Sequence, residues 1–424
     1  MSQTATQQAA PPPPTAAAAP AHAAPAPGAA AQADPAFVDT PALLNRWQLI
    51  GMSVTILFGI LSALVQFVSW QADGRAADDT EQLVRTQEIK TSLLRADALA
   101  TNAFLKGGLE EPEQRREYDE AIDGVLTDIA DAAEAQPADR KALAALNVEV
   151  TEYATAVAQA RDNNRQNYPI GAEYLSGADV ELRATALPIL DELVDANQQR
   201  AEDAMSGQHP FWLLLLGVAT LVALVWLNRE LARHFRRRVN KGLAIAAVIV
   251  LAVTLVTMIG AWIRDSSNDS LRDGEFATAV AEADARTAGN DAKAKESLRL
   301  IKRGSGATYE ERWKESADAV MSSGTRAKTS WLAYKDVHDQ IVALDDQGRW
   351  GEARDMAIEQ SGEAFEPFDE ATRAAVEENG ALATEALRSG RWLALVVSAL
   401  TLGLGVTAAV AVSRGIGERR REFS

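Results

Sequence analysis

Histidine, cysteine and paired carboxylates form most catalytic and metal-binding sites, so their number and spacing indicate whether a chain can have such a site. The chain has no cysteine, which excludes thiol catalysis, thiolate metal ligands and disulfides. Its four histidines are widely separated, and no pair has the spacing of metal ligands: His22, His209, His234 and His338. A glycine-rich phosphate loop and the GxSxG and HExxH motifs are also missing. We therefore expect no catalytic, cofactor-binding or metal-binding residue, and a protein that is not an enzyme.

His338 lies close to a seam of apolar residues formed by Trp331, Tyr334 and Ile341. A polar residue at such a seam is more often packed and hydrogen-bonded in a core than used to contact a ligand. The expected role of His338 is therefore structural. The many Asp and Glu residues recur along the predicted helices at positions that are expected to face solvent. No pair among them indicates acid–base chemistry.

Two polar stretches could contact an outer partner or a ligand. The first, RDNNRQNYPIGAEYL, contains Asn163, Asn164, Arg165 and Tyr168; the second, DDQGRWGEARDMA, contains Arg349 and Trp350. Asn, Asp, Gly and Pro are also the residues that inter-helix turns require. The turn interpretation and the binding interpretation both remain open, and turn chemistry is the simpler one.

Four apolar segments are long enough to cross a bilayer: residues 47–70, 210–227, 242–263 and 391–413. Their apolar cores contain no Asp, Glu, Lys or Arg, and tryptophans mark their ends, where amphipathic rings settle at the headgroups. Four spans place both termini on one side of the plasma membrane. The loop 228–241 carries six Lys/Arg and the tail 414–424 is rich in Arg, so loop, tail and termini are predicted to be cytoplasmic. Residues 1–46, rich in Pro and Ala, are predicted to form a disordered cytoplasmic arm.

The segments between the spans, residues 71–209 and 264–390, are predicted to be extracytoplasmic. They hold 28 and 26 Asp/Glu against 13 and 17 Lys/Arg, which argues against nucleic acid as a partner. Apolar residues recur every three or four positions, as in a helical bundle. Breaks at Gly107–Gly108, Pro137 and Asn163–Gly171 divide the first segment into four helices, and Pro188 is expected to kink the last.

The second segment repeats the plan of the first. Asp97-Ala98-x-Ala100 matches Asp291-Ala292-x-Ala294, and the spacing within Tyr118, Asp123 and Val125 recurs in Trp313, Asp318 and Val320. The common order of these matches indicates a duplication. The predicted fold is an all-α membrane protein with four transmembrane helices and two extracytoplasmic four-helix bundles in a tandem repeat.

Paired spans around bundles of this kind resemble the sensor domains of bacterial chemoreceptors, as do the stretches AFLKGGLEEPEQRREYDEAI, NNRQNYPIGAEYL and GRWGEARDMA. The double arrangement without a signalling domain more narrowly resembles the GlnX-type family of four-span actinobacterial membrane proteins that activate protein kinase G. The resemblance covers residues 45–424 through topology and loosely specific motifs. It implies signal transduction in amino-acid sensing and nitrogen metabolism. Its implied partners are an extracytoplasmic amino-acid-binding lipoprotein of the glutamate/aspartate/glutamine class and a cytosolic Ser/Thr kinase.

The basic loop and tail are the candidate contacts of an inner partner: Arg233, Arg236, Arg237, Arg238, Lys241, Arg419, Arg420 and Arg421. Such clusters also attract anionic membrane lipid. Two other functions remain open: direct sensing of a small molecule by the bundles, and a structural role as a cell-envelope scaffold. A second copy of the chain, in a homodimer, is a further candidate partner. Separately, glycines in the spans permit close packing of the span helices: Gly51, Gly59, Gly403 and Gly405.

Overall fold

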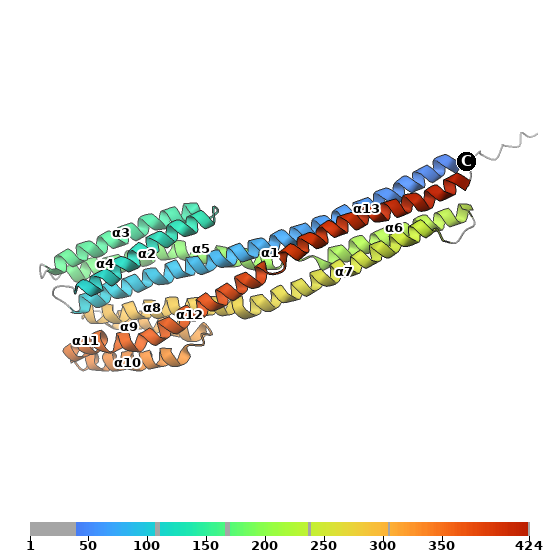
Figure 1. Cartoon of the computed structure of the whole chain (residues 1–424). Helices are drawn as coiled ribbons and strands as arrows, with labels where there is room; N and C mark the ends of the chain where they lie inside the picture. Colours follow the sequence, from blue (N-terminus) through green and yellow to red (C-terminus); the bar gives the residue numbers. More distant parts are fainter. Residues whose placement is uncertain (1–39, 107–110, 166–169, 236–238, 304–305, 423–424) are drawn as a thin grey trace, which may run out of the picture.

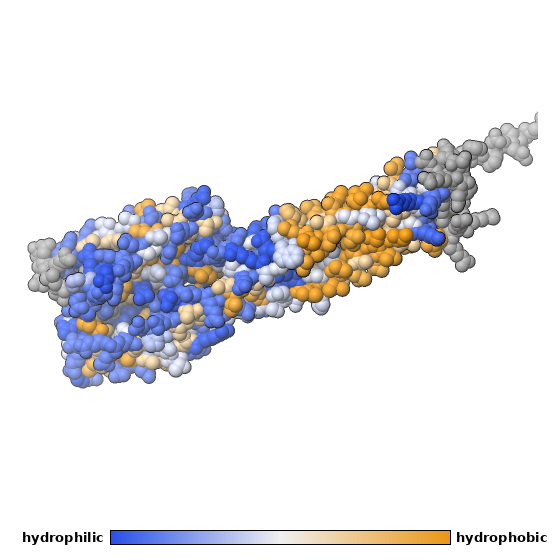
Figure 2. Space-filling view, in the orientation of Figure 1, coloured by the Kyte–Doolittle hydropathy of each residue, from blue (hydrophilic) through white to orange (hydrophobic). Residues whose placement is uncertain are grey.

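The protein is a long helical molecule (Figure 1), and one half of its length is apolar whereas the other half is polar (Figure 2). The computed structural model describes residues 40–106, 111–165, 170–235, 239–303 and 306–422. In these ranges every regular element is a helix, and four helices are long and apolar enough to cross a membrane. The all-α membrane fold predicted from the sequence is confirmed.

The spanning segments lie in α1 (Thr40–Lys106), α6 (Pro210–Phe235), α7 (Lys241–Leu271) and α13 (Arg391–Glu422). Figure 2 shows a continuous hydrophobic surface over this half of the molecule. Large apolar side chains point outward there: Val222, Val248 and Trp392 are 62%, 65% and 71% exposed. Because exposing an apolar surface of this extent to water is energetically unfavourable, this half of the molecule is the part that lies in lipid.

Two glycines bring α1 and α13 together within the membrane. A Cβ built on Gly59 would lie 3.0 Å from the Cα of Gly405, and one built on Gly405 would lie 2.7 Å from the Cα of Gly59. The two backbones therefore touch at a point where only glycine leaves room. A Cβ on Gly403 meets nothing within 4 Å, so that glycine makes no such approach.

Bundle 1 combines the outer part of α1 with α2 (Pro112–Ala135), α3 (Arg140–Arg165), α4 (Gly171–Ala184) and α5 (Ala186–Met205). Its core contains the seam residues expected from their spacing, including Tyr118, Val125, Leu146 and Tyr153. Pro112 opens α2 because its missing N–H is not needed in a first turn. The predicted break at Gly107–Gly108 lies outside the described residues.

The fourth helix of bundle 1 is interrupted rather than kinked at the expected proline. α4 and α5 are separated at Thr185, and Pro188 lies in the first turn of α5. The physical reason is that proline fits a first helical turn, whereas in a helix interior it removes a hydrogen bond and clashes with the preceding turn. The chain therefore restarts the helix just before the proline.

Bundle 2 begins with a π-helical turn, η1 (Arg272–Phe276), which follows α7. It continues with α8 (Ala277–Ile301), α9 (Gly306–Ser322), α10 (Lys328–Asp346), α11 (Trp350–Glu359) and α12 (Ser361–Arg388). Its core is aromatic, with Trp313, Trp331, Tyr334, Phe365 and Phe368. The repeat extends to the interruption of the last helix, because α11 and α12 are separated at Gln360 as α4 and α5 are at Thr185.

The bundles are continuous with the spans. α1 runs unbroken for 67 residues from the spanning half to the far end of bundle 1, and α7 passes through η1 into α8 (Figure 1). In the polar half, α1 packs against α2 and α5 of bundle 1 and also against α8 and α12 of bundle 2. The two bundles therefore share α1 as a common wall.

Candidate functional site: a charged cleft between the two bundles

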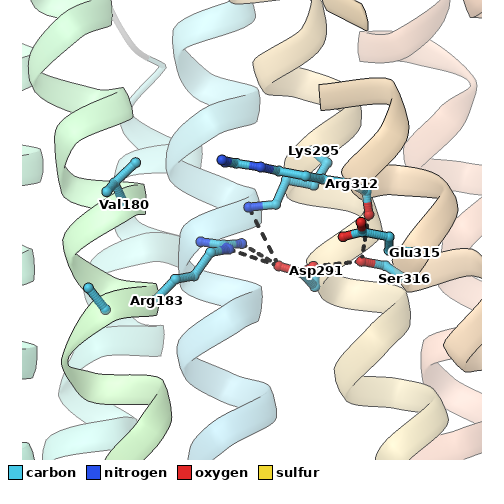
Figure 3. Close-up of a pocket in the computed structure, with 8 residues that line it drawn as sticks. Val180, Arg183, Asp291, Lys295, Arg312, Glu315 and Ser316 are labelled. Carbon is cyan, nitrogen blue, oxygen red and sulfur yellow. Dashed lines mark hydrogen bonds and ion pairs between the residues drawn. The ribbon is translucent and has the colours of Figure 1, made fainter. Parts of the chain in front are cut away.

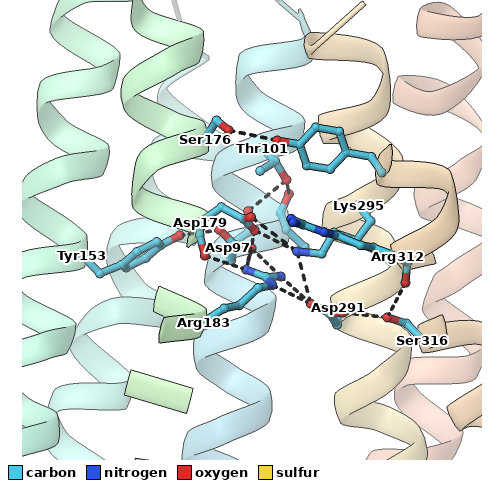
Figure 4. A network of polar contacts seen from close by, with 12 residues as sticks. Asp97, Thr101, Tyr153, Ser176, Asp179, Arg183, Asp291, Lys295, Arg312 and Ser316 are labelled. Carbon is cyan, nitrogen blue, oxygen red and sulfur yellow. Dashed lines mark hydrogen bonds and ion pairs between the residues drawn. The ribbon is translucent and has the colours of Figure 1, made fainter. Parts of the chain in front are cut away.

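A buried ionic cluster joins the two bundles at the middle of their shared wall (Figure 4). Its centre is Arg183 on α4, which contacts Asp97 on α1 at 3.2 Å and is ion-paired with Asp291 on α8. Asp97 and Asp291 are the matching aspartates of the two sequence repeats. Arg183 therefore pairs with aspartates at equivalent positions of the two repeats.

Lys295 extends this cluster from α8 toward bundle 1. Its Nζ lies 3.1 Å from Asp179 Oδ1 on α4 and 3.7 Å from Asp291 Oδ1 one turn earlier on α8. Lys295 is 1% exposed and Asp179 is fully buried. Buried charges need such partners, because an isolated charge in a protein interior costs several kcal/mol.

The cluster contains three carboxylates and two cations, and their pKa values reflect that imbalance. Burial, reinforced by the neighbouring Asp179, raises the pKa of Asp97 to about 6, although Arg183 opposes this shift. Burial would also raise the pKa of Asp291, but Arg183 and Lys295 outweigh it and hold that pKa below its ordinary value. Tyr153 donates a 3.0 Å hydrogen bond to Asp97, which helps to hold that carboxylate.

Beside the cluster, two adjoining cavities of about 400 and 440 Å³ open between the bundles. Arg183, Asp291, Glu315 and Ser316 line both of them. Figure 3 shows α4 on one side of this cleft and α9 on the other, with the ion pairs of Arg183, Asp291 and Lys295 between them. We use "inter-bundle cleft" for this space.

The α9 side of the inter-bundle cleft carries two charges without ionic partners. Arg312 and Glu315 are exposed, line the cleft and form no ion pair with any described residue. Ser316 differs, because its hydroxyl donates a 2.6 Å hydrogen bond to Asp291. The only ring that Arg312 contacts among the described residues is that of Tyr309, whose centre lies 5.8 Å from the guanidinium. The cleft thus has a floor of ion-paired groups and a wall with two charges that have no ionic partner.

Further polar contacts hold the bundles together around the cleft. Ser176 on α4 and Tyr309 on α9 share a hydroxyl–hydroxyl hydrogen bond of 2.9 Å (Figure 4). Nearer the membrane, Arg286 on α8 contacts Glu88 on α1 at 2.7 Å and Asp369 on α12 at 2.9 Å. The interface therefore combines these polar contacts with apolar packing, such as that of Leu105 on α1 against Leu300 and Ile341 of bundle 2.

A second polar cluster lies where the bundles meet the spans, and we call it the juxtamembrane junction. Its centre is Asp73 on α1, which is 4% exposed. Asp73 accepts hydrogen bonds from Gln208 at 3.0 Å, from Arg264 at 3.0 Å and from Asn268 at 3.2 Å. Arg264 also donates to the carbonyl of Leu387, at the end of α12, at 2.7 Å. This junction links all four chain segments that enter the membrane.

His338 has the core position expected from the sequence. It is fully buried, stacks on Trp313 with ring centroids 3.7 Å apart, and bonds Glu296 at 2.9 Å and Glu310 at 3.3 Å. Burial lowers the pKa of His338, but its two carboxylate partners outweigh burial and raise the pKa above its ordinary value. Burial raises the pKa of Glu296, yet Lys293 and His338 together lower it to about 2.

The predicted outer contacts lie apart from the inter-bundle cleft. Asn163 and Asn164 are in the last turn of α3, at the end of bundle 1 farthest from the spans (Figure 1). The side chain of Arg165 and all of Tyr168 are outside the described residues. Arg349 pairs with Glu352 at 2.8 Å on the surface. The contact role of these residues stays a prediction.

Trp350, the other predicted outer contact, belongs to an arginine-flanked cluster at the far end of bundle 2. Its indole N–H donates to the carbonyl of Leu300 at 2.9 Å. The guanidiniums of Arg303 and Arg354 lie 3.5 and 5.3 Å from its ring centre. These contacts give Trp350 a packing role of its own.

The predicted inner contacts are only partly described. Arg233 pairs with Glu230 at 3.2 Å, and Lys241 is the first residue of α7. Arg236, Arg237 and Arg238 lie outside the described residues, as do the side chains of Arg419, Arg420 and Arg421.

Sequence reasoning missed Asn240, which connects the loop to the last span. Its side chain caps α7 by accepting from the Gly242 N–H at 2.9 Å and donates to the Gly415 carbonyl at 2.9 Å. Asp97, Asp291 and Arg183 were also not predicted as site residues. The repeated Asp-Ala-x-Ala was the available signal, because a charged residue between core alanines must find a buried partner.

Comparisons with known proteins agree with a sensor. Residues 72–206, from the juxtamembrane junction to the end of α5, match the family model of an actinobacterial sensor domain. This match covers less than half of the chain and corresponds to bundle 1. No curated protein and no solved structure gives a significant match. Together with four helices that can span a membrane, the match supports a multi-pass transmembrane sensor of the actinobacterial type.

Proposed function

We propose that this chain is a non-enzymatic transmembrane sensor that relays extracytoplasmic amino-acid status to a cytosolic Ser/Thr kinase of the protein kinase G type. Its outer partner would be a solute-binding lipoprotein loaded with an amino acid of the glutamate, aspartate or glutamine class. The observation that carries the relay is the continuity of α1, a single helix of 67 residues shared by a span and both bundles.

The relay would work through the interface between the bundles. A partner that binds one arrangement of the bundles more tightly than another shifts the population toward that arrangement. The ionic cluster around Arg183 favours discrete arrangements, because its charges are stable only when they are paired. The juxtamembrane junction ties the same helices together at the membrane, so a shift or rotation of one span would displace the others.

On the inner side, the response would be the position of the basic loop and tail. Asn240 bonds the start of α7 to α13, so movement of either span changes how the loop and the tail are presented together. In this proposal the cytosolic kinase contacts Arg233, Arg236–Arg238, Lys241 and Arg419–Arg421. The termini, loop and tail would all be cytoplasmic.

Crosslinking in living cells, followed by mass spectrometry of the captured full-length protein, tests both partners. Recovery of an amino-acid-binding lipoprotein and a cytosolic Ser/Thr kinase is the expected result. Recovery of envelope or division proteins alone would favour the scaffold function instead.

A second experiment tests the loop. Replacing Arg236, Arg237 and Arg238 by Glu should abolish kinase activation, provided that reporter fusions show an unchanged topology. Full activation with the loop reversed in charge would remove the loop from the mechanism.

A further inference from the structure

We propose that the inter-bundle cleft is a binding site for a small zwitterion that carries a carboxylate and an ammonium group, of the α-amino-acid class. Arg312 would hold the carboxylate and Glu315 the ammonium, above the ion-paired floor of Arg183, Asp291 and Lys295. This inference deepens the proposed sensor function and rests on it for its biological meaning. It gives this chain a ligand site of its own, independent of a binding lipoprotein.

The charged side chains of α9 are paired on its outward face and unpaired where they line the cleft. On the outward face, Lys314 pairs with Glu311 at 3.3 Å, as neighbouring opposite charges on a helix usually do. Arg312 and Glu315 have the same three-residue spacing, but they form no ion pair with each other. Both project into the cleft, so each can accept a charged group of a ligand (Figure 3).

The floor of the cleft is preorganised for a ligand. Asp291 is held by Arg183 and by the Ser316 hydroxyl, while Lys295 is held by Asp179. These groups are already paired, so they can orient a ligand without rearranging. Preorganised polar groups reduce the cost of ordering a site when a ligand binds.

The charge of the cleft also favours this ligand class. With the buried carboxylates included, the cleft holds four cations, Lys90, Arg183, Lys295 and Arg312, against six acids: Asp97, Asp179, Asp191, Asp284, Asp291 and Glu315. The site is therefore acidic by two charges when all of these groups are charged. A dianion would be repelled and a simple cation would leave Arg312 without an ionic partner, whereas a zwitterion satisfies both Arg312 and Glu315.

Size and position agree with this ligand class. The cavities of about 400 and 440 Å³ are at the small end of ligand pockets, which span roughly 300–1,000 Å³. Val180, Arg183 and Ala184 of α4 form the opposite wall. A ligand held by α9 would thus touch both bundles, and its affinity would depend on their spacing.

Calorimetry on the purified full-length protein in lipid nanodiscs tests the site. The titrants are the twenty protein amino acids, glutarate as a carboxylate without an ammonium, and putrescine as an ammonium without a carboxylate. At least one amino acid should bind, whereas glutarate and putrescine should not. Arg312→Met and Glu315→Gln should each weaken binding roughly tenfold or more, since each removes a charge-assisted contact.

Lys314→Met and Glu311→Gln are the matched controls, because they alter the outward pair on the same helix. They should leave affinity unchanged. Arg312 and Glu315 are exposed, so thermal melting should confirm that their variants fold normally.

Two results would overturn the proposal: no amino acid binds, or binding is unaffected by both cleft variants. If neither result occurs but the crosslinking experiment does not recover the kinase, the ligand site in the cleft is supported and the proposed relay to a kinase is rejected. If the lipoprotein and the kinase are captured while the cleft binds nothing, the relay stands without this site.

Discussion

At the scale of single residues, the fold depends on charges that are buried and paired. Arg183 satisfies three aspartates, and Asp97 is 86 positions away from it in the sequence. This distance is why the cluster could not be predicted. The sequence shows a repeated Asp-Ala-x-Ala, but only the packed helices identify the arginine that both aspartates share. His338 was predictable, because its apolar neighbours lie one turn away on the same helix.

Arg183→Met is expected to lower the free energy of unfolding by about 3 kcal/mol or more, since it leaves buried carboxylates without their main cation. Thermal or denaturant unfolding in nanodiscs measures this change. Arg373→Met is the control, because Arg373 makes only an exposed pair with Glu377, and it should change stability by no more than about 0.5 kcal/mol. Equal effects of the two variants would show that the cluster is not important for stability.

His338 gives a pH dependence with a defined sign. Its pKa in the folded protein is raised above the ordinary 6.5 by Glu296 and Glu310, although burial opposes this. The folded state therefore holds the proton more tightly, and its contribution to stability is complete below pH 6.5 and is lost as pH rises through the folded pKa. Melting temperatures from pH 6.5 upward should fall less steeply for His338→Gln than for the native chain. Parallel curves would contradict this role.

At the scale of helices, the spans were predicted well because each is a local apolar run that needs no partner to be recognised. The interruptions at Thr185 and Gln360 and the π-helical η1 were not predicted. Such irregularities depend on how helices from distant segments pack. The same holds for the juxtamembrane junction, whose four chain segments meet only in the fold.

The contact between α1 and α13 predicts a difference between two glycines two residues apart. Gly405→Leu should destabilise the protein by about 1–3 kcal/mol, because its side chain would enter the backbone of α1 at Gly59. Gly403→Leu should be tolerated, because a Cβ there meets nothing within 4 Å. Melting of both variants in nanodiscs measures the difference. A similar loss of stability in both variants would show that this contact between α1 and α13 is absent in the membrane.

The juxtamembrane junction predicts local loosening when its arginine is removed. Arg264→Met deletes charged hydrogen bonds to Asp73 and to the carbonyl of Leu387. Hydrogen exchange of amides near residues 204–210 and 384–390 should accelerate roughly tenfold, since such bonds contribute about 1.5–3 kcal/mol. Arg272→Met, which removes only exposed pairs with Asp269 and Asp273, should leave this exchange unchanged. Unchanged exchange in Arg264→Met would mean that the junction does not couple these segments.

At the scale of the whole molecule, the duplication produced two bundles that are no longer equivalent. Bundle 1 has a mainly aliphatic core with two tyrosines and matches a known sensor domain, whereas bundle 2 has an aromatic core with a buried histidine. Bundle 1 supplies Arg183 to the shared ionic cluster and bundle 2 supplies Lys295. The sequence revealed the repeat, but the interface between its two halves appears only in the fold.

In the proposed relay, the two bundles move together with the ends of the spans that carry the basic loop and tail. The chain has no cysteine, so introduced pairs can carry spin labels without background. One pair, at the exposed Val148 and Leu332, reports on the bundles. The other, at the exposed Val239 and Glu418, reports on the ends of α7 and α13 that lie farthest from the bundles.

Electron–electron distance measurements in nanodiscs, with and without the amino-acid-loaded lipoprotein, test this claim most directly. The account predicts that both distance distributions change together. In Arg264→Met, the distance between labels at Val148 and Leu332 should still change, whereas the distance between labels at Val239 and Glu418 should stay constant. A ligand-dependent change in kinase activation with both distances constant would contradict the account.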